Sequence, residues 1–193
     1  MATAAPTATM SLDEYLALPH DDSVDRVVIE GELMERPMSR CNRFHGFAMS
    51  QVADSLHSWR RTQAKPEGLV FCGDVGFILS RDPLTTFGTD VAYVSLATLS
   101  RQTDESTQIV GCPIVAVEVL SPSDMQEDIT EKIRLYLRNG TSVVWIVDPD
   151  DGSVTMYRSP RKPKFFSGDD EITCEPELPG FRANVSEFFL PEL

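Results

Sequence analysis

The sequence lacks any run of about 18 consecutive apolar residues, and this absence excludes a membrane-spanning helix. Its first ten residues, MATAAPTATM, have neither a basic start nor a sustained apolar stretch, so they do not resemble a secretory signal. We predict a loose arm at residues 1–10 and a single domain at residues 11–193. The expected location is the cytoplasm.

Positive charge is scarce as well, because 17 Lys and Arg face 30 Asp and Glu, which gives a formal net charge of −13. Such a chain repels polyanions as a whole, so any phosphate contact must be local or assisted by a metal. The cysteines form no CxxC pair and show no zinc-ligand spacing, and we expect them to be reduced. They are Cys41, Cys72, Cys112 and Cys174.

The residues predict an α/β domain with a mixed central sheet and helices against it. A capping box at Ser11 and Glu14 predicts a short helix through Leu18, and Gly31 predicts the turn of a hairpin. Ser123 is the expected N-cap of the second long helix. The long helices are predicted over residues 40–62 and 124–139, with buried stripes of Phe44, Ala48, Val52, Leu56 and Trp59, and of Met125, Ile129, Ile133 and Tyr136. The expected strands cover residues 69–72, 75–79, 90–94, 114–120, 142–147 and 154–157.

Glu118 stands alone in an otherwise apolar, β-branched segment, residues 113–120. Such a run is typical of an interior strand that is covered on both faces. Strand alternation places Glu118 on the face of Ala116 and Leu120, opposite the neighbouring valines. Because ionised carboxylates are rarely buried unless they are paired or bind a metal, Glu118 is a candidate site residue.

Three other charged residues are candidates for the same site. Asp128 and Lys132 are four residues apart on the second long helix, at the border of its packed face, where a lysine can aim its ammonium at the sheet. Asp90 begins the strand-like segment at 90–94. Two carboxylates and a lysine meet the requirement of Mg²⁺-dependent phosphodiester hydrolysis, because the oxygens hold the ion and the lysine assists the attacking water. The alternative is a structural buried ion pair.

Five segments of the chain resemble, in order, the motifs of the Uma-two family. These bacterial proteins belong to the restriction-endonuclease-like, PD-(D/E)XK superfamily, so the resemblance implies a restriction-endonuclease-like α/β fold with a mixed central sheet flanked by helices. The similarity covers about residues 11–190. The segments are VIEGELME, FGTDVAYVS, IVAVEVLSPS, Asp128-Ile-Thr-Glu-Lys132 and SVVWIVDPD.

The resemblance implies a role for each matching residue. Asp90 and Glu118 would be the acidic pair that holds Mg²⁺ or Mn²⁺, and Lys132 would be the catalytic lysine. Asp128 and His45 match supporting residues, although a polar residue on a helix face also explains His45. The resemblance further implies an endonuclease acting on nucleic acid, with DNA as the expected form, and a homodimer.

Two positions depart from the family pattern. Val27 stands where relatives usually carry a helper acid, a change that would weaken metal binding unless Asp25, Glu30 or Glu32 compensates. Thr89 replaces the proline that usually precedes the aspartate, which is a mild change because threonine suits a strand. The alternative function is therefore a catalytically silent nuclease fold that acts as a binding or scaffold module.

The segment RSPRKPKFF, residues 158–166, is the only dense basic patch in this acidic chain. Cations beside aromatic residues suit contacts with a nucleic-acid backbone and its bases. A solvated loop is the other interpretation. The candidate contact residues are Arg158, Arg161, Lys162 and Lys164.

Overall fold

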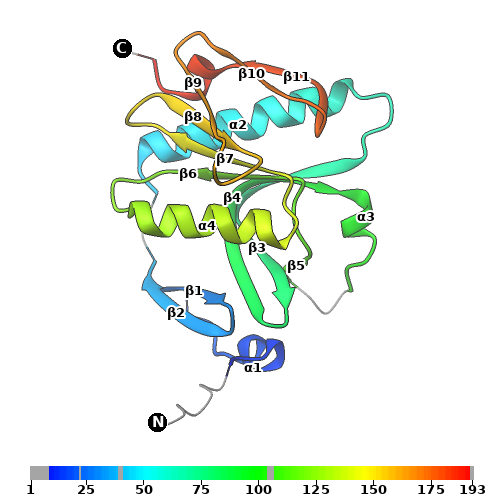
Figure 1. Cartoon of the computed structure of the whole chain (residues 1–193), viewed down its shortest axis with the longest axis vertical. Coiled ribbons are helices and arrows are strands. Elements are labelled where there is room, and N and C mark those ends of the chain that lie inside the picture. Colours follow the sequence, from blue (N-terminus) through cyan, green and yellow to red (C-terminus); the bar gives the residue numbers. More distant parts are fainter. Residues whose placement is uncertain (1–8, 22, 39–40, 104–106, 192–193) are drawn as a thin grey trace.

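A seven-stranded mixed sheet forms the centre of the molecule (Figure 1). The structure is a computed structural model that describes residues 9–21, 23–38, 41–103 and 107–191. The strands are β3 (Gly68–Arg81), β4 (Leu84–Ser95), β5 (Ile109–Val110), β6 (Val115–Val119), β7 (Val143–Asp148), β8 (Ser153–Tyr157) and β9 (Lys164–Ser167). Their order is β5-β3-β4-β6-β7-β8-β9, and the pairs β3–β5 and β6–β7 are parallel. The predicted mixed α/β architecture is confirmed.

Two long helices cover opposite faces of this sheet (Figure 1). α2 (Arg43–Thr62) packs on the face that carries Val115 and Val117, and α4 (Gln126–Asn139) packs on the face of Ala116. The alternation along β6 therefore turns Glu118 towards α4, as the sequence predicts.

α2 begins after Asn42, whose side-chain oxygen accepts hydrogen bonds from the main-chain N–H groups of Phe44 and His45. Residue 40, the predicted start, lies outside the described residues. The predicted burial of Phe44 is wrong, because Phe44 lies in the first turn, is 40% exposed and packs against the Arg43 guanidinium. The buried residues of the predicted stripe are Ala48, Val52, Leu56 and Trp59.

α4 connects the parallel strands β6 and β7, and Gly140 ends it in a left-handed conformation, with φ 115°. Its predicted start is wrong. Asp124 accepts a hydrogen bond from the Ser121 N–H at 2.7 Å in a separate turn, so Ser123 does not cap the helix. Met125 takes the N-cap position and is 60% exposed, in contrast to its predicted burial.

Two hairpins and three short helices complete the described chain. The capping box of Ser11 and Glu14 is confirmed, and Gly31 turns the first hairpin with φ 86°. Neither α2 nor any other helix in the described ranges is long and apolar enough to cross a membrane. The hairpin strands are β1 (Val24–Ile29), β2 (Glu32–Pro37), β10 (Glu171–Cys174) and β11 (Leu178–Asn184), and the short helices are α1 (Leu12–Leu16), α3 (Leu96–Leu99) and the 3-10 helix η1 (Val185–Phe188).

The predicted strands 69–72 and 75–79 are parts of one strand, β3, which a bulge interrupts. Gly73 and Asp74 form the bulge, with φ of 105° and 54°. A left-handed conformation suits glycine and is tolerated by aspartate. Because a bulge bends its strand and re-aims a side chain, Asp74 leaves the regular alternation of β3.

Candidate active site

Asp90 and Glu118 lie on the adjacent antiparallel strands β4 and β6. The strand register pairs Val91 with Val117, so Asp90 continues the series opposite Glu118 and emerges on the same face. Beyond this pair a side-chain contact replaces the ladder, because the main-chain N–H of Val119 donates to Asp90 Oδ2 at 2.8 Å. The two acids therefore meet at one point of the sheet.

Glu118 is 7% exposed, and both of its oxygens accept hydrogen bonds from α4. Lys132 Nζ lies 2.8 Å from Oε2, and the Tyr136 hydroxyl lies 2.7 Å from Oε1. Lys132 and Tyr136 are one helical turn apart, which brings both side chains to the same carboxylate. The lone acid of the apolar strand thus has two partners.

Burial raises the pKa of Glu118, and the nearby Lys132 ammonium opposes this rise. Burial also disfavours the charge of Lys132, but the Glu118 carboxylate outweighs it and raises the Lys132 pKa. Because both Glu118 oxygens face donors, the arrangement suits an ionised carboxylate beside a permanent ammonium.

His45 approaches Asp90 from the first turn of α2, with Nε2 3.5 Å from Oδ2. The hydrogen bond to Asp90 raises the pKa of His45 against the effect of burial. His45 Nδ1 is buried and has no partner among the described residues. Since the described contacts of Asp90 involve Oδ2, its Oδ1 is available to a ligand in the cleft that Asp90 lines.

The side chains of His45, Asp90, Glu118 and Lys132 line one cleft of about 770 Å³, which lies between the β1–β2 hairpin, the start of α2 and α4. Among the described residues that line it, the two permanent cations are both paired: Lys132 with Glu118, and Arg36 with Asp128 at 2.9 Å. Asp128 therefore joins β2 to α4 through its salt bridge with Arg36. The acidic residues along this acidic cleft are Asp25, Asp74, Asp90, Glu118, Asp124, Asp128 and Glu131.

Val27, at the position of the missing helper acid, contributes an apolar wall to the acidic cleft. Of the three acids that could replace this helper, only Asp25 lines the cleft within the described residues. Glu30 instead forms a salt bridge of 2.6 Å with Arg138.

Asp74 is a site residue that the sequence analysis missed. Its Oδ1 lies so close to Gly88 that a β-carbon at this glycine would overlap the carboxylate. Desolvation raises the pKa of Asp74, and the negative charges of Asp25 and Asp90 raise it further. The β3 bulge thus delivers an additional acid to the cleft, and this position could not be read from strand periodicity.

Tyr136 and Thr89 were also missed as site residues. The Tyr136 hydroxyl has one proton, and the closer of its two acceptors is Glu118 Oε1, since the Gly88 carbonyl lies at 3.3 Å. Thr89 Oγ1 lies 2.6 Å from the same hydroxyl and therefore donates to it. The threonine that replaces the usual proline supports the tyrosine that holds Glu118. The spacing of four between Lys132 and Tyr136 was the available signal.

The basic segment does not act as one patch. Arg158 donates to Glu177 at 2.7 Å and to the Glu175 carbonyl at 2.8 Å, which ties it to the β10–β11 hairpin. Arg161 lines a second cleft, together with residues of α4. Lys162 and Lys164 are exposed.

The donors of the acidic cleft fit a hard, partly hydrated cation. In the described ranges no three His, Cys, Asp or Glu side chains form a ready-made metal cage. Mg²⁺ does not need one, because it is usually held by one or two carboxylates together with water and substrate phosphates. Asp90 Oδ1 and the remaining lone pairs of Glu118 are of this type.

The fold is similar to that of a crystal structure from Anabaena variabilis ATCC 29413, described as "a putative nuclease belonging to DUF820". The two structures superpose with a TM-score of 0.74 at 21% sequence identity, over 93% of this chain and 97% of the other. The likeness establishes a shared fold. No curated protein matches the chain significantly.

The family model described as "Uma2: Putative restriction endonuclease" matches residues 12–186. This span contains all five motifs that carry the resemblance and every residue of the acidic cleft. The predicted family is confirmed. The chain belongs to the Uma2 family of restriction-endonuclease-like proteins.

Proposed function

We propose that the protein is a divalent-metal-dependent endonuclease that hydrolyses phosphodiester bonds of nucleic acid in the acidic cleft. One observation carries the proposal: Asp90 and Glu118 meet from adjacent strands, with the Lys132 ammonium 2.8 Å from Glu118. Membership of a nuclease-like family supports the reaction class.

Each residue has a distinct task in this proposal. Asp90 and Glu118 hold Mg²⁺ or Mn²⁺, which when bound lowers the pKa of a water molecule and offsets negative charge. Lys132 stabilises the charge that develops on the phosphate and orients the attacking water. His45 holds Asp90, and Tyr136 holds Glu118, so that neither carboxylate needs to reorganise during the reaction.

The competing function is that of a catalytically silent binding or scaffold module. Two observations favour it: the apolar Val27 at the helper position, and the engagement of both Glu118 oxygens by internal donors. Under this alternative, Lys132 and Glu118 form a structural ion pair.

Cleavage assays separate the two functions. Plasmid, single-stranded DNA and RNA are incubated with the protein and Mg²⁺ or Mn²⁺, beside Asp90→Asn and Lys132→Met. We expect both variants to lose at least about 100-fold in rate. Equal cleavage by parent and variants would indicate a contaminating nuclease and overturn the proposal.

A second measurement does not depend on activity. Mn²⁺ should raise the melting temperature of the parent, because a ligand that binds only the folded state stabilises it. Asp90→Asn should abolish this rise. A parent that gains no stability from Mg²⁺ or Mn²⁺ supports the scaffold function. DNA as the substrate, the homodimer and the cytoplasmic location stay predictions.

A further inference from the structure

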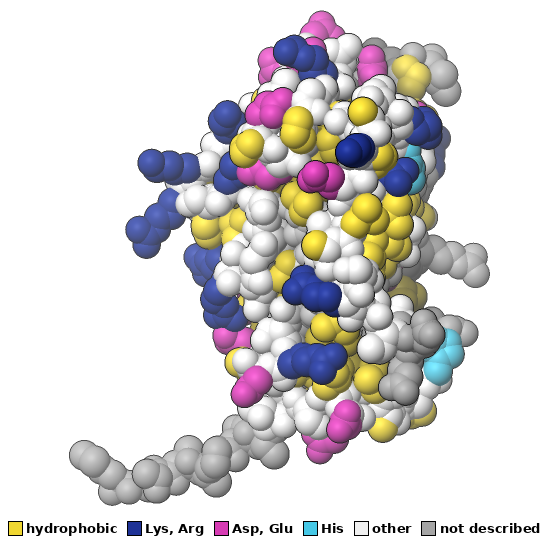
Figure 2. Space-filling model, turned by 90° about the vertical axis from the view of Figure 1, so that its right-hand side faces the viewer, with side chains coloured by type: hydrophobic (Ala, Val, Ile, Leu, Met, Phe, Trp, Pro, Cys, Tyr) yellow, Lys and Arg dark blue, Asp and Glu magenta, His cyan; other side chains and the backbone are white. Residues whose placement is uncertain are grey.

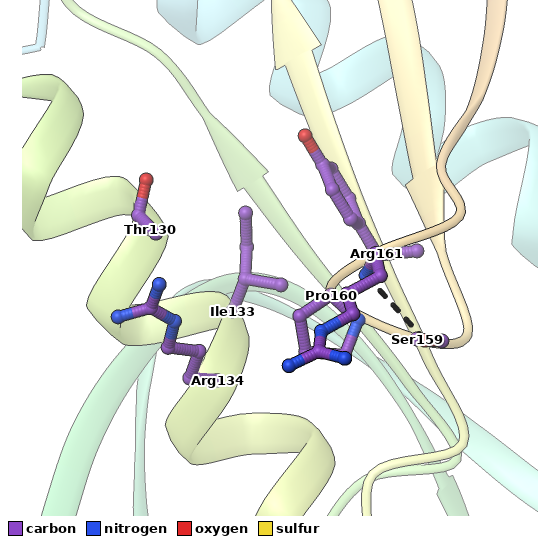
Figure 3. A pocket seen from close by; sticks show the side chains of 7 residues that line it. Thr130, Ile133, Arg134, Ser159, Pro160 and Arg161 are labelled. Atoms are coloured by element: carbon purple, nitrogen blue, oxygen red, sulfur yellow. Dashed lines mark hydrogen bonds between the residues drawn. The ribbon is translucent and has the colours of Figure 1, made fainter.

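A second cleft, of about 570 Å³, lies on the other flank of α4 (Figure 3). Glu131 and Lys132 line the acidic cleft, whereas Thr130 and Arg134 line the second one, so the helix is a wall of both. The residues that build the second cleft are Thr130, Ile133 and Arg134 of α4 and Tyr157, Ser159 and Arg161 on the opposite wall. We call it the basic cleft.

The two arginines of the basic cleft have no carboxylate partner in the part of the chain that the structure describes. Other arginines of the described chain do, such as Arg138 with Glu30 and Arg182 with Glu171. Arg134 and Arg161 form no salt bridge with the described residues. None of the described residues that line the basic cleft is acidic. In a chain with a net charge of −13, two guanidinium groups at one cleft without a described carboxylate partner are a local concentration of positive charge.

Figure 2 shows how Lys and Arg side chains are distributed over one face of the molecule. Lys and Arg side chains gather along the left edge of that view, which is the side of the molecule that faces the viewer in Figure 1. This side carries α4 (Figure 1). The helix that forms one wall of the basic cleft therefore lies on the side of the molecule where Lys and Arg side chains gather.

The other walls of the basic cleft narrow the class of anion. A guanidinium group matches phosphate in geometry and charge. The half-buried Tyr157 supplies an aromatic surface, and Ile133 supplies an apolar one. Phosphate contacts beside an aromatic ring are the combination that binds single-stranded nucleic acid, because every base has a face that can stack.

The position of the basic cleft suits the strand that enters the acidic cleft. An α-helix with its side chains is about 10–12 Å wide. With a rise of about 3.4 Å per nucleotide, roughly three nucleotides cross α4 from one cleft to the other. We propose that Arg134, Arg161 and Tyr157 bind a backbone phosphate and a base of a single-stranded segment of the substrate. This inference rests on the proposed function, since it supplies the strand that is hydrolysed beside Lys132.

Anisotropy of a fluorescein-labelled 12-nucleotide oligothymidylate, measured in EDTA, tests the inference without metal or cleavage. The double variant Arg134→Ala/Arg161→Ala should bind at least about tenfold more weakly. Its slope of log affinity against log salt should fall by about 0.7, the value for one lost phosphate contact on a single strand. Arg101→Ala/Arg182→Ala removes the same charge from two exposed arginines elsewhere and should change affinity less than about twofold.

Tyr157→Phe should bind as the parent does, whereas Tyr157→Leu should lose about fivefold or more, because only the ring is required. Equal losses in the two arginine double variants would reduce the effect to overall charge and overturn the site. Failure of the parent to bind, or equally effective competition by duplex DNA, would also overturn it.

The outcomes separate this inference from the nuclease proposal. Arginine-dependent binding without cleavage in any metal would keep the basic cleft and remove the nuclease. Metal-dependent cleavage with full binding by Arg134→Ala/Arg161→Ala would keep the nuclease and remove the basic cleft.

Discussion

The two flanks of α4 differ in whether their cationic side chains form salt bridges with carboxylates. The described residues of the acidic cleft include seven acids, and the two permanent cations among them, Arg36 and Lys132, both form salt bridges with carboxylates. The basic cleft has two arginines and no acid among its described residues. On one side α4 thus carries a lysine paired with Glu118, and on the other an arginine without a salt-bridge partner among the described residues. The two flanks therefore differ in the pairing of their described cations rather than in the number of them.

The largest effect is expected from Lys132→Met. This change leaves Glu118 buried without its ammonium, and we expect the free energy of unfolding to fall by about 2–4 kcal/mol at neutral pH. Urea denaturation measures the loss. The double variant Lys132→Met/Glu118→Gln should recover most of it, and an additive double variant would show that the two residues are not coupled.

The loss in Lys132→Met should also depend on pH. Burial raises the pKa of Glu118 in the folded protein above its unfolded value. In the pH window between these two pKa values, the folded state binds more protons than the unfolded state. Stability therefore falls as the pH rises through the window, and the deficit of the variant should be smallest below a pH of about 4. A deficit that stays constant from pH 4 to pH 7 would contradict an unpaired buried carboxylate.

A smaller effect is expected from Tyr136→Phe, which removes the hydrogen bonds to Glu118 and Thr89. We expect a loss of about 1–3 kcal/mol in urea denaturation. Thr89→Val should lose less, and Thr89→Ser, which keeps the hydroxyl, should remain near the parent. Similar values for Val and Ser at position 89 would argue against the hydroxyl contact.

His45→Gln should have a modest, pH-dependent effect. The pKa of His45 is raised by Asp90, so its contribution to stability is fully present below the unfolded pKa of about 6.5 and is lost as the pH rises through the higher folded value. The difference between parent and variant, about 0.5 kcal/mol at pH 5.5, should disappear at alkaline pH. NMR titration of His45 checks the direction directly, because a folded pKa below 6.5 would be inconsistent with the contact.

The smallest effect is expected from Arg134→Met, the counterpart of Lys132→Met two residues away. Arg134 has no salt-bridge partner among the described residues, so the free energy of unfolding should change by no more than about 0.5 kcal/mol. Thermal and urea denaturation of the two methionine variants provide the comparison. Equal destabilisation would remove the distinction between the two flanks.

Much of this arrangement could be predicted from the sequence, because it depends on local spacing. A lone acid in an apolar strand requires a partner, and helical periodicity points Lys132 towards it. The helical spacing predicts Tyr136 as part of the buried stripe, and an aromatic residue in such a stripe is usually explained by packing. Its hydroxyl acquires a role only when Thr89 and Glu118 meet it from two other elements.

The residues that escaped prediction depend on irregular backbone or on competing local contacts. Asp74 reaches the cleft through a bulge, which strand periodicity cannot anticipate. Ser123 fits an N-cap pattern, yet the Asp124 carboxylate accepts the Ser121 N–H in a preceding turn and delays the helix. In both cases, short-range geometry outweighs a valid statistical preference.

Gly88 and Asp74 place a constraint on how this protein can diverge. The carboxylate of Asp74 occupies the space that any side chain at position 88 would need. A side chain at Gly88 therefore displaces the Asp74 carboxylate from its present place in the cleft. The position of the acid that the bulge contributes depends on this glycine, so we expect substitutions at the two positions to be energetically coupled.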